Sequence, residues 1–100
     1  IHYIEQNFQN DISIEEIAGV CGINRSYFGK IFRKSIGKSP QEFLMNYRMI
    51  KATELLSLTS LSISEISQAV GYDNPLHFSR AFKNVYGVSP RNWRIENKIE

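Results

Sequence analysis

The chain has 100 residues, of which 42% are hydrophobic and 22% charged, with a formal net charge of +2. Its one cysteine, Cys21, excludes an internal disulfide bond, and no apolar run approaches the roughly 18 residues of a membrane span. These values predict a small soluble domain in a reducing compartment, without a membrane partner, so we expect a cytoplasmic protein. Because the chain begins with Ile1, we also expect it to be part of a longer protein.

Seven helices are expected, and no segment shows the two-residue alternation of a strand. In chain order they cover residues 1–9, 13–21, 25–36, 39–58, 62–70 and 75–86, with a last helix from residue 90 that carries Trp93. Three pairs predict capping boxes at helix starts, namely Ser13 with Glu16, Ser39 with Glu42, and Ser62 with Glu65. The fold class is therefore all-α, with about seven helices.

The helix over residues 39–58 is apolar on two sides and contains no glycine or proline after its first turn. Met45, Met49, Ala52 and Leu56 form one stripe with Leu44 and Leu55 beside them, whereas Phe43, Tyr47 and Ile50 form a second. A helix with two apolar stripes needs a packing partner on each side. We therefore expect a rod of roughly 25–28 Å that joins two lobes. The expected boundaries are 1–38 for the first lobe, 39–58 for the joining helix and 59–100 for the second lobe.

The two lobes repeat each other in sequence. Residues 14–43 match residues 63–93, and Phe28, Phe32, Gly37, Ser39 and Pro40 recur as Phe78, Phe82, Gly87, Ser89 and Pro90. Each copy is expected to fold as a short helix, a glycine-bearing turn and a second helix, which is the helix-turn-helix pattern.

Charge alternates in blocks along this repeat. Residues 25–38 and 75–94 carry basic side chains and no acid, whereas residues 1–24 and 53–74 carry acids and no Lys or Arg. The small net charge therefore conceals two basic patches, one on the second helix of each copy.

The second helix of each copy is expected to have a core face and an opposite, exposed face. The core faces are Phe28, Ile31, Phe32 and Ile36 in the first copy, and Phe78, Ala81, Phe82 and Val85 in the second. The exposed faces are Arg25, Ser26, Gly29, Lys30 and Arg33, and Pro75, Leu76, Ser79, Arg80 and Lys83. Helices of this kind enter the DNA major groove, so these faces are candidates for contacts with phosphates and base edges. A single basic face is more often a solvated surface, but two at equivalent positions favour double-stranded DNA.

The chain resembles the DNA-binding domain of the AraC/XylS family of bacterial transcription regulators. The resemblance covers nearly all the chain and rests on Arg48, Ala52, Leu55, Leu56 and the stretches 63–66, 70–72, 78–83 and 87–90. It implies two helix-turn-helix lobes joined by a long helix, binding to promoter or operator DNA, and a separate effector or dimerisation domain elsewhere in the parent chain.

Carried over by position, the family's base-reading sites fall on Ser26, Gly29 and Lys30, and on Pro75, Leu76, Ser79 and Arg80. Direct readout should rest chiefly on Arg80, followed by Lys30 and Arg25, and His77 is a candidate phosphate contact. Gly29 has two readings of equal weight, because it could permit close helix packing or close approach of the backbone to DNA.

The sequence gives little support for an enzyme or a metal-binding protein. No catalytic triad, paired carboxylates or phosphate loop can be assembled, and the histidines are not spaced for a metal, so we expect no enzyme, metal or cofactor. The alternative is a helix-turn-helix module that docks another protein, such as an RNA polymerase subunit, through its acidic helices. We expect RNA polymerase as a partner in either case, no small-molecule ligand in this part of the chain, and a place in the bacterial nucleoid.

Overall fold

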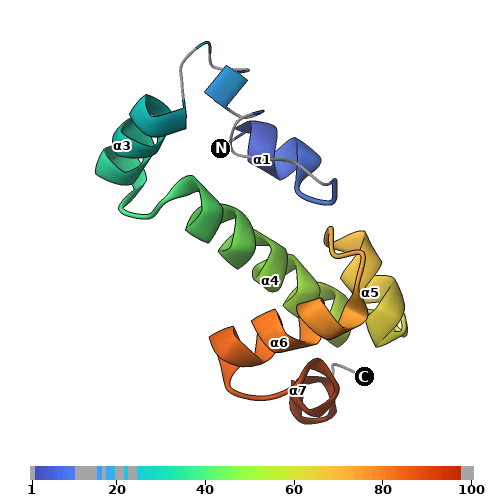
Figure 1. Cartoon of the computed structure of the whole chain (residues 1–100). Coiled ribbons are helices and arrows are strands. Elements are labelled where there is room, and N and C mark those ends of the chain that lie inside the picture. Colours follow the sequence, from blue (N-terminus) through green and yellow to red (C-terminus); the bar gives the residue numbers. More distant parts are fainter. Residues whose placement is uncertain (1, 11–15, 17, 20–21, 23–24, 98–100) are drawn as a thin grey trace.

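A computed structural model describes residues 2–10, 16, 18, 19, 22 and 25–97 of the chain (Figure 1). The described residues contain six helices and no strand, which confirms the all-α class. The helices are α1 (His2–Asn7), α3 (Arg25–Ile36), α4 (Pro40–Leu58), α5 (Ile63–Ala69), α6 (Pro75–Tyr86) and α7 (Pro90–Asn97). Most of the helix expected over residues 13–21, including its cap at Ser13, lies outside the described residues.

Of the three expected capping boxes, two lie within the described residues, and one of these two is complete. The Ser62 hydroxyl accepts a hydrogen bond from the Glu65 N–H, and the Glu65 carboxylate accepts one from the Ser62 N–H, both at 3.0 Å. These bonds favour the ionised carboxylate and lower the pKa of Glu65. Ser39 also caps its helix, but the Glu42 carboxylate instead accepts bonds from the Ser39 hydroxyl and from Arg33. The expected box at Ser39 is therefore only half formed.

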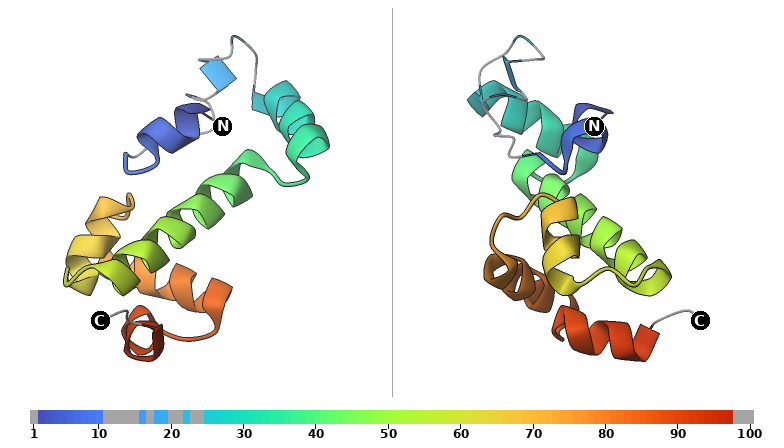
Figure 2. Two further views of the ribbon diagram at one scale, coloured as in Figure 1. Left: turned by 180° about the vertical axis from the view of Figure 1, so that it is seen from behind. Right: turned by 90° about the vertical axis from the view of Figure 1, so that its right-hand side faces the viewer.

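Helix α4 is the common support of two hydrophobic clusters. Near its start, Leu44 joins a cluster with Ile4, Ala18, Phe28 and Phe32. Further along, Met49, Ala52 and Leu56 join a second cluster with Ile66, Val70, Phe78 and Phe82. Figure 1 shows α3 at one end of α4 and α6 at the other, and the two views in Figure 2 show the same separation. The two-lobed architecture expected from the sequence is therefore confirmed.

Four apolar side chains that were expected to be covered are exposed to solvent. The exposed fractions are 42% for Ile31, 38% for Ile36, 53% for Ile50 and 39% for Val85. At about 100° per residue, Ile31 and Ile50 point about 60° or more away from the buried residues of their own helices. Ile36 and Val85 instead lie in the last turns of α3 and α6, beyond the buried phenylalanines. The apolar stripe read from the sequence was thus wider than the band that the neighbouring helices cover.

Helix α7 closes the second lobe. Trp93 packs edge-on against Phe82, with ring centroids 6.1 Å apart. Arg94 donates hydrogen bonds to the carbonyls of Leu56, at 3.1 Å, and Thr59, at 3.5 Å. These carbonyls lie at the end of α4, where the helix has no partners of its own and carries partial negative charge. Arg94 therefore ties α7 to the far end of α4.

Candidate nucleic-acid interface

The outer face of α3 lies opposite its two buried phenylalanines. Phe28 and Phe32 are only 8% and 6% exposed. At about 100° per residue, Lys30 lies on the far side of the helix from both. Ser26 and Arg33 lie within about 60° of Lys30 around the helix, and all three side chains are exposed. We define Ser26, Lys30 and Arg33 as the outer face of α3.

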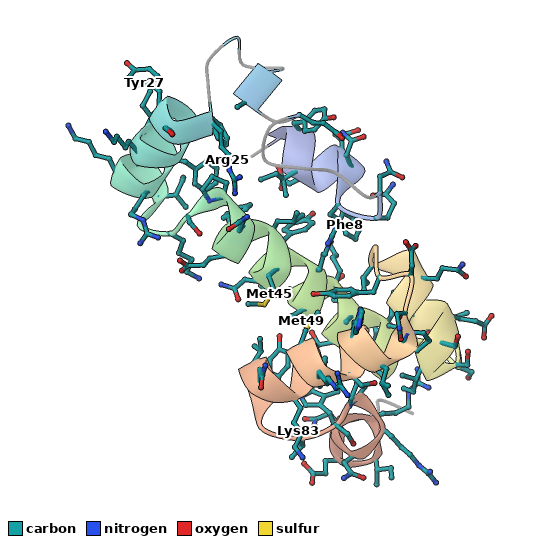
Figure 3. The ribbon with its side chains drawn as sticks, in the orientation of Figure 1. Phe8, Arg25, Tyr27, Met45, Met49 and Lys83 are labelled. Atoms are coloured by element: carbon teal, nitrogen blue, oxygen red, sulfur yellow. The ribbon has the colours of Figure 1, made fainter. Side chains whose placement is uncertain are left out.

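The outer face of α6 has the same geometry. Phe78 and Phe82 are fully buried, and Leu76, Arg80 and Lys83 occupy the positions equivalent to Ser26, Lys30 and Arg33. Leu76 is 60% exposed. Figure 3 shows Lys83 on the side of α6 away from α4, and Met49 on the side of α4 that faces α6.

The local fold fixes α6 against α5. The buried Ser67 hydroxyl donates to the Tyr72 carbonyl at 3.1 Å, and the Tyr72 N–H donates to the Ser67 carbonyl at 2.9 Å. Asn74 then caps α6 through its side-chain oxygen, which accepts from the Leu76 N–H at 2.8 Å. The turn therefore presents the first residues of α6 to solvent in one orientation.

Nine of the eleven expected DNA-binding residues are exposed, and Gly29 and Ser79 are half-buried. The exposed residues are Arg25, Ser26, Lys30, Arg33, Pro75, Leu76, His77, Arg80 and Lys83. They fall into two separate groups, one on α3 and one on α6.

Arg25 departs from the outer face on which it was expected. Position 25 lies only about 60° around the helix from Phe28, on the core side of α3. Figure 3 accordingly shows Arg25 on the side toward α1, whereas Tyr27 projects away from the molecule. Arg25 therefore lies at the flank of α3 rather than beside Lys30.

Arg33 has an acidic neighbour that the local sequence did not reveal. Its guanidinium lies 3.2 Å from the Glu42 carboxylate, which comes from the first turn of α4. The two side chains are 61% and 52% exposed, so the pair contributes about 1 kcal/mol or less and a phosphate can displace it.

The open space around Gly29 argues against one of its two explanations, close packing between helices. A Cβ atom at this position would meet no atom within 4 Å, and its φ angle is not positive. Close helix packing therefore does not require glycine at position 29. The reading in which the backbone approaches DNA stays a prediction.

The sequence reasoning missed three exposed residues beside these faces. Tyr27 is 54% exposed and occupies the position equivalent to His77. Lys34 and Asn84, one position after Arg33 and Lys83, are also exposed. Their helical angles could have revealed them, because all three point within about 60° of the direction of Lys30 or Arg80.

Within the described ranges, no group of three His, Cys, Asp or Glu side chains is arranged to hold a metal ion. None of the helices in the same part of the chain is both long enough and apolar enough to cross a bilayer.

Comparison with known proteins identifies the fold family. The sequence model of a family described as a helix-turn-helix domain, of the AraC/XylS type, matches residues 9–95. The chain belongs to this AraC/XylS-type family. It is 40% identical over 102 residues to the lactose operon transcription activator of Staphylococcus xylosus, covering 98% of this chain and 37% of that protein.

Solved structures of AraC/XylS-type domains share the architecture. The C-terminal domain of AraT, a response regulator from Geobacillus stearothermophilus, matches with a TM-score of 0.96 and 37% identity over 99% of this chain and 83% of that one. The DNA-binding domain of AdpA, solved in complex with a target DNA, matches with a TM-score of 0.88 and 25% identity, covering 93% of this chain and 83% of that one. This chain is thus a DNA-binding domain of the family, and it spans about a third of the length of curated relatives.

Proposed function

We propose that this chain binds one asymmetric duplex site of nearly two helical turns as a monomer, with α3 and α6 in successive major-groove segments. The observation that carries the proposal is the pair of equivalent basic outer faces at opposite ends of one continuous helix, α4 (Figure 1). We call the duplex that engages both faces the composite site, and a duplex that engages α6 alone the half-site.

The dimensions of the molecule support this arrangement. Successive major-groove segments on one face of B-DNA are about 34 Å apart. The chain measures 44 Å along its longest axis, and the 19 residues of α4 separate the two helix-turn-helix lobes. One molecule is therefore long enough to reach two successive segments without a partner subunit.

The side chains on the outer faces suggest a division of roles. We assign base reading chiefly to Arg80, whose planar guanidinium can donate two hydrogen bonds to a guanine, and next to Lys30. Leu76 can contact a thymine methyl group. Lys83 and Arg33, further along their helices, suit phosphate contacts. Arg25, at the flank of α3, and His77 suit phosphates as well.

Smaller groups allow the helices to approach the groove. Gly29 and Ser79 occupy equivalent, half-buried positions at the edges of the outer faces. Their small size lets the backbone lie close to the bases, and Ser26 adds a short hydroxyl at the equivalent of Leu76. Pro75, at the first position of α6, provides a rigid start without a donor of its own.

We further propose the setting in which this domain acts. The named relative is an activator, so a contact with RNA polymerase at bacterial promoters is consistent with the family. Since the chain spans only part of its relatives, we place effector binding or dimerisation outside it, and we propose no catalytic role or cofactor for this part. The corresponding location is the cytoplasm, at the nucleoid. We divide the domain into lobes 1–38 and 59–100 around the joining helix 39–58.

Alanine variants of Arg80 and Lys83 test the assigned roles. Both side chains are exposed on one helix, so each variant is a control for the other's effect on stability. On a composite site selected from a random pool, Arg80→Ala should lose about 1–3 kcal/mol and relax the preference at one base pair. Lys83→Ala should weaken selected and scrambled duplexes alike and lower the salt slope by about one contact. If Arg80→Ala weakens both duplexes equally, Arg80 contacts phosphate and the reading role is wrong.

A further inference from the structure

Arg48, in the middle of α4, contacts both lobes at once. Its Nε donates to the carbonyl of Phe8 and its Nη2 to the carbonyl of Asn10, both at 2.8 Å. These two carbonyls belong to the chain that follows α1 in the first lobe. The same guanidinium lies 5.6 Å from the ring centroid of Tyr72, in the helix-turn-helix turn of the second lobe.

The second lobe approaches this point so closely that no side chain fits. Gly71, which precedes Tyr72 in the turn, has a φ of +97°. A Cβ atom on Gly71 would lie 2.5 Å from the Phe8 carbonyl oxygen and 3.0 Å from Arg48 Nε and Nη2. Backbone of the first lobe, the Arg48 guanidinium and backbone of the second lobe are therefore in direct contact.

Phe8 extends the contact into both cores. Its half-buried ring packs against the first cluster and also against the second. It meets Tyr47 of α4 edge-on, with ring centroids 5.1 Å apart. In Figure 3, Phe8 lies in the space between α1, α4 and the turn before α6. Arg48 holds the backbone of the same residue whose ring bridges the two clusters.

We infer that Arg48 is a positioning residue for the DNA interface: it locks the turn of the second lobe against the end of α1, and so sets the spacing and angle between α3 and α6. This role rests on the proposed binding of both outer faces to one duplex. A purely local role, in which Arg48 only satisfies the carbonyls after α1, would leave the second lobe where it is.

A measurement without DNA tests whether Arg48 sets the geometry between α3 and α6. Spin labels on cysteines at Lys34 and Asn84, both exposed, report the distance between α3 and α6, with Cys21→Val removing the native thiol. We expect one narrow distance distribution for the parent chain. Arg48→Met, which keeps the length of the side chain but not its donors, should broaden or shift it, and Arg48→Lys should partly restore it.

Glycine variants of the second lobe test the same contact between the lobes. Gly71→Ala introduces a methyl group against the Phe8 carbonyl, whereas Gly87→Ala, at a φ of +81°, meets nothing within 4 Å. Both variants carry backbone strain from a positive φ, so their difference isolates the contact between lobes. Gly71→Ala should change the distance distribution and Gly87→Ala should not. Unchanged distributions in both Arg48→Met and Gly71→Ala would overturn the inference.

Affinities for the two duplexes then test whether this geometry matters for DNA binding. Arg48→Met should lose about tenfold or more on the composite site, because simultaneous contacts depend on geometry, and should bind the half-site as the parent does. An equal loss on both duplexes would mean that Arg48 acts only on folding, against the inference. If the parent chain binds the composite site and the half-site equally, the proposal that both outer faces bind one duplex is wrong. The distance distributions measured without DNA would still decide the role of Arg48.

Discussion

Replacing Ile50 by proline is expected to uncouple the two lobes without removing a buried side chain from either core. Ile50 lies inside α4 and is 53% exposed. Proline removes the N–H that bonds the carbonyl of Asn46, and its ring clashes with that carbonyl, at a cost of about 3 kcal/mol or more. We therefore expect the affinity for the composite site to fall to that for the half-site, measured by fluorescence anisotropy on both duplexes.

Ile50→Ala is the matched control. It removes the same exposed side chain but keeps the backbone hydrogen bond, so its affinity and its helical circular dichroism should stay close to those of the parent. The proline variant should lose helical signal. Parent-like affinity of Ile50→Pro for the composite site would mean that the lobes do not need a continuous rod.

Raising the salt concentration is expected to weaken duplex binding steeply. If about three or four basic side chains of the two outer faces and their flanks neutralise phosphates, log K falls with log salt at a slope of about −3. A rise from about 50 to about 200 mM salt should then lower the affinity roughly 60-fold, through release of counterions. The measurement is a set of binding isotherms at several salt concentrations.

Two lysine variants separate the interface from the rest of the surface. Lys30→Gln, on the outer face of α3, should reduce the slope by about one contact. Lys51→Gln should leave it unchanged, because Lys51 lies on α4 and pairs with Glu54 at 3.5 Å. An absence of duplex binding at about 50 mM salt would instead favour the alternative of a protein-docking module.

The sequence predicts those features that depend on neighbours along the chain. The capping box at Ser62 formed as expected, because it needs only a polar side chain at the cap and a carboxylate three residues later. The two apolar sides of α4 also predicted a helix between two cores, since hydrophobic residues on both sides must be covered. The buried Phe28 and Phe32 fixed the direction of the outer face of α3 in the same way.

Contacts between distant segments were not predictable from local patterns. Arg48 is one of the residues that carry the family resemblance, but only the fold brings its guanidinium to carbonyls 38 and 40 residues away. The ion pair of Arg33 with Glu42 and the exposure of Ile50 likewise depend on how closely one helix covers another. The flanking position of Arg25, by contrast, follows from its helical angle to Phe28, so the sequence alone could have revealed it.

Hydroxyl-radical footprinting of the chain on its selected duplex most directly tests whether both recognition helices bind one site. With α3 and α6 in successive major-groove segments, we expect two protected regions on one face of the duplex, about 10 base pairs apart. A chain that protects only one segment at saturating concentration would contradict two-lobe binding.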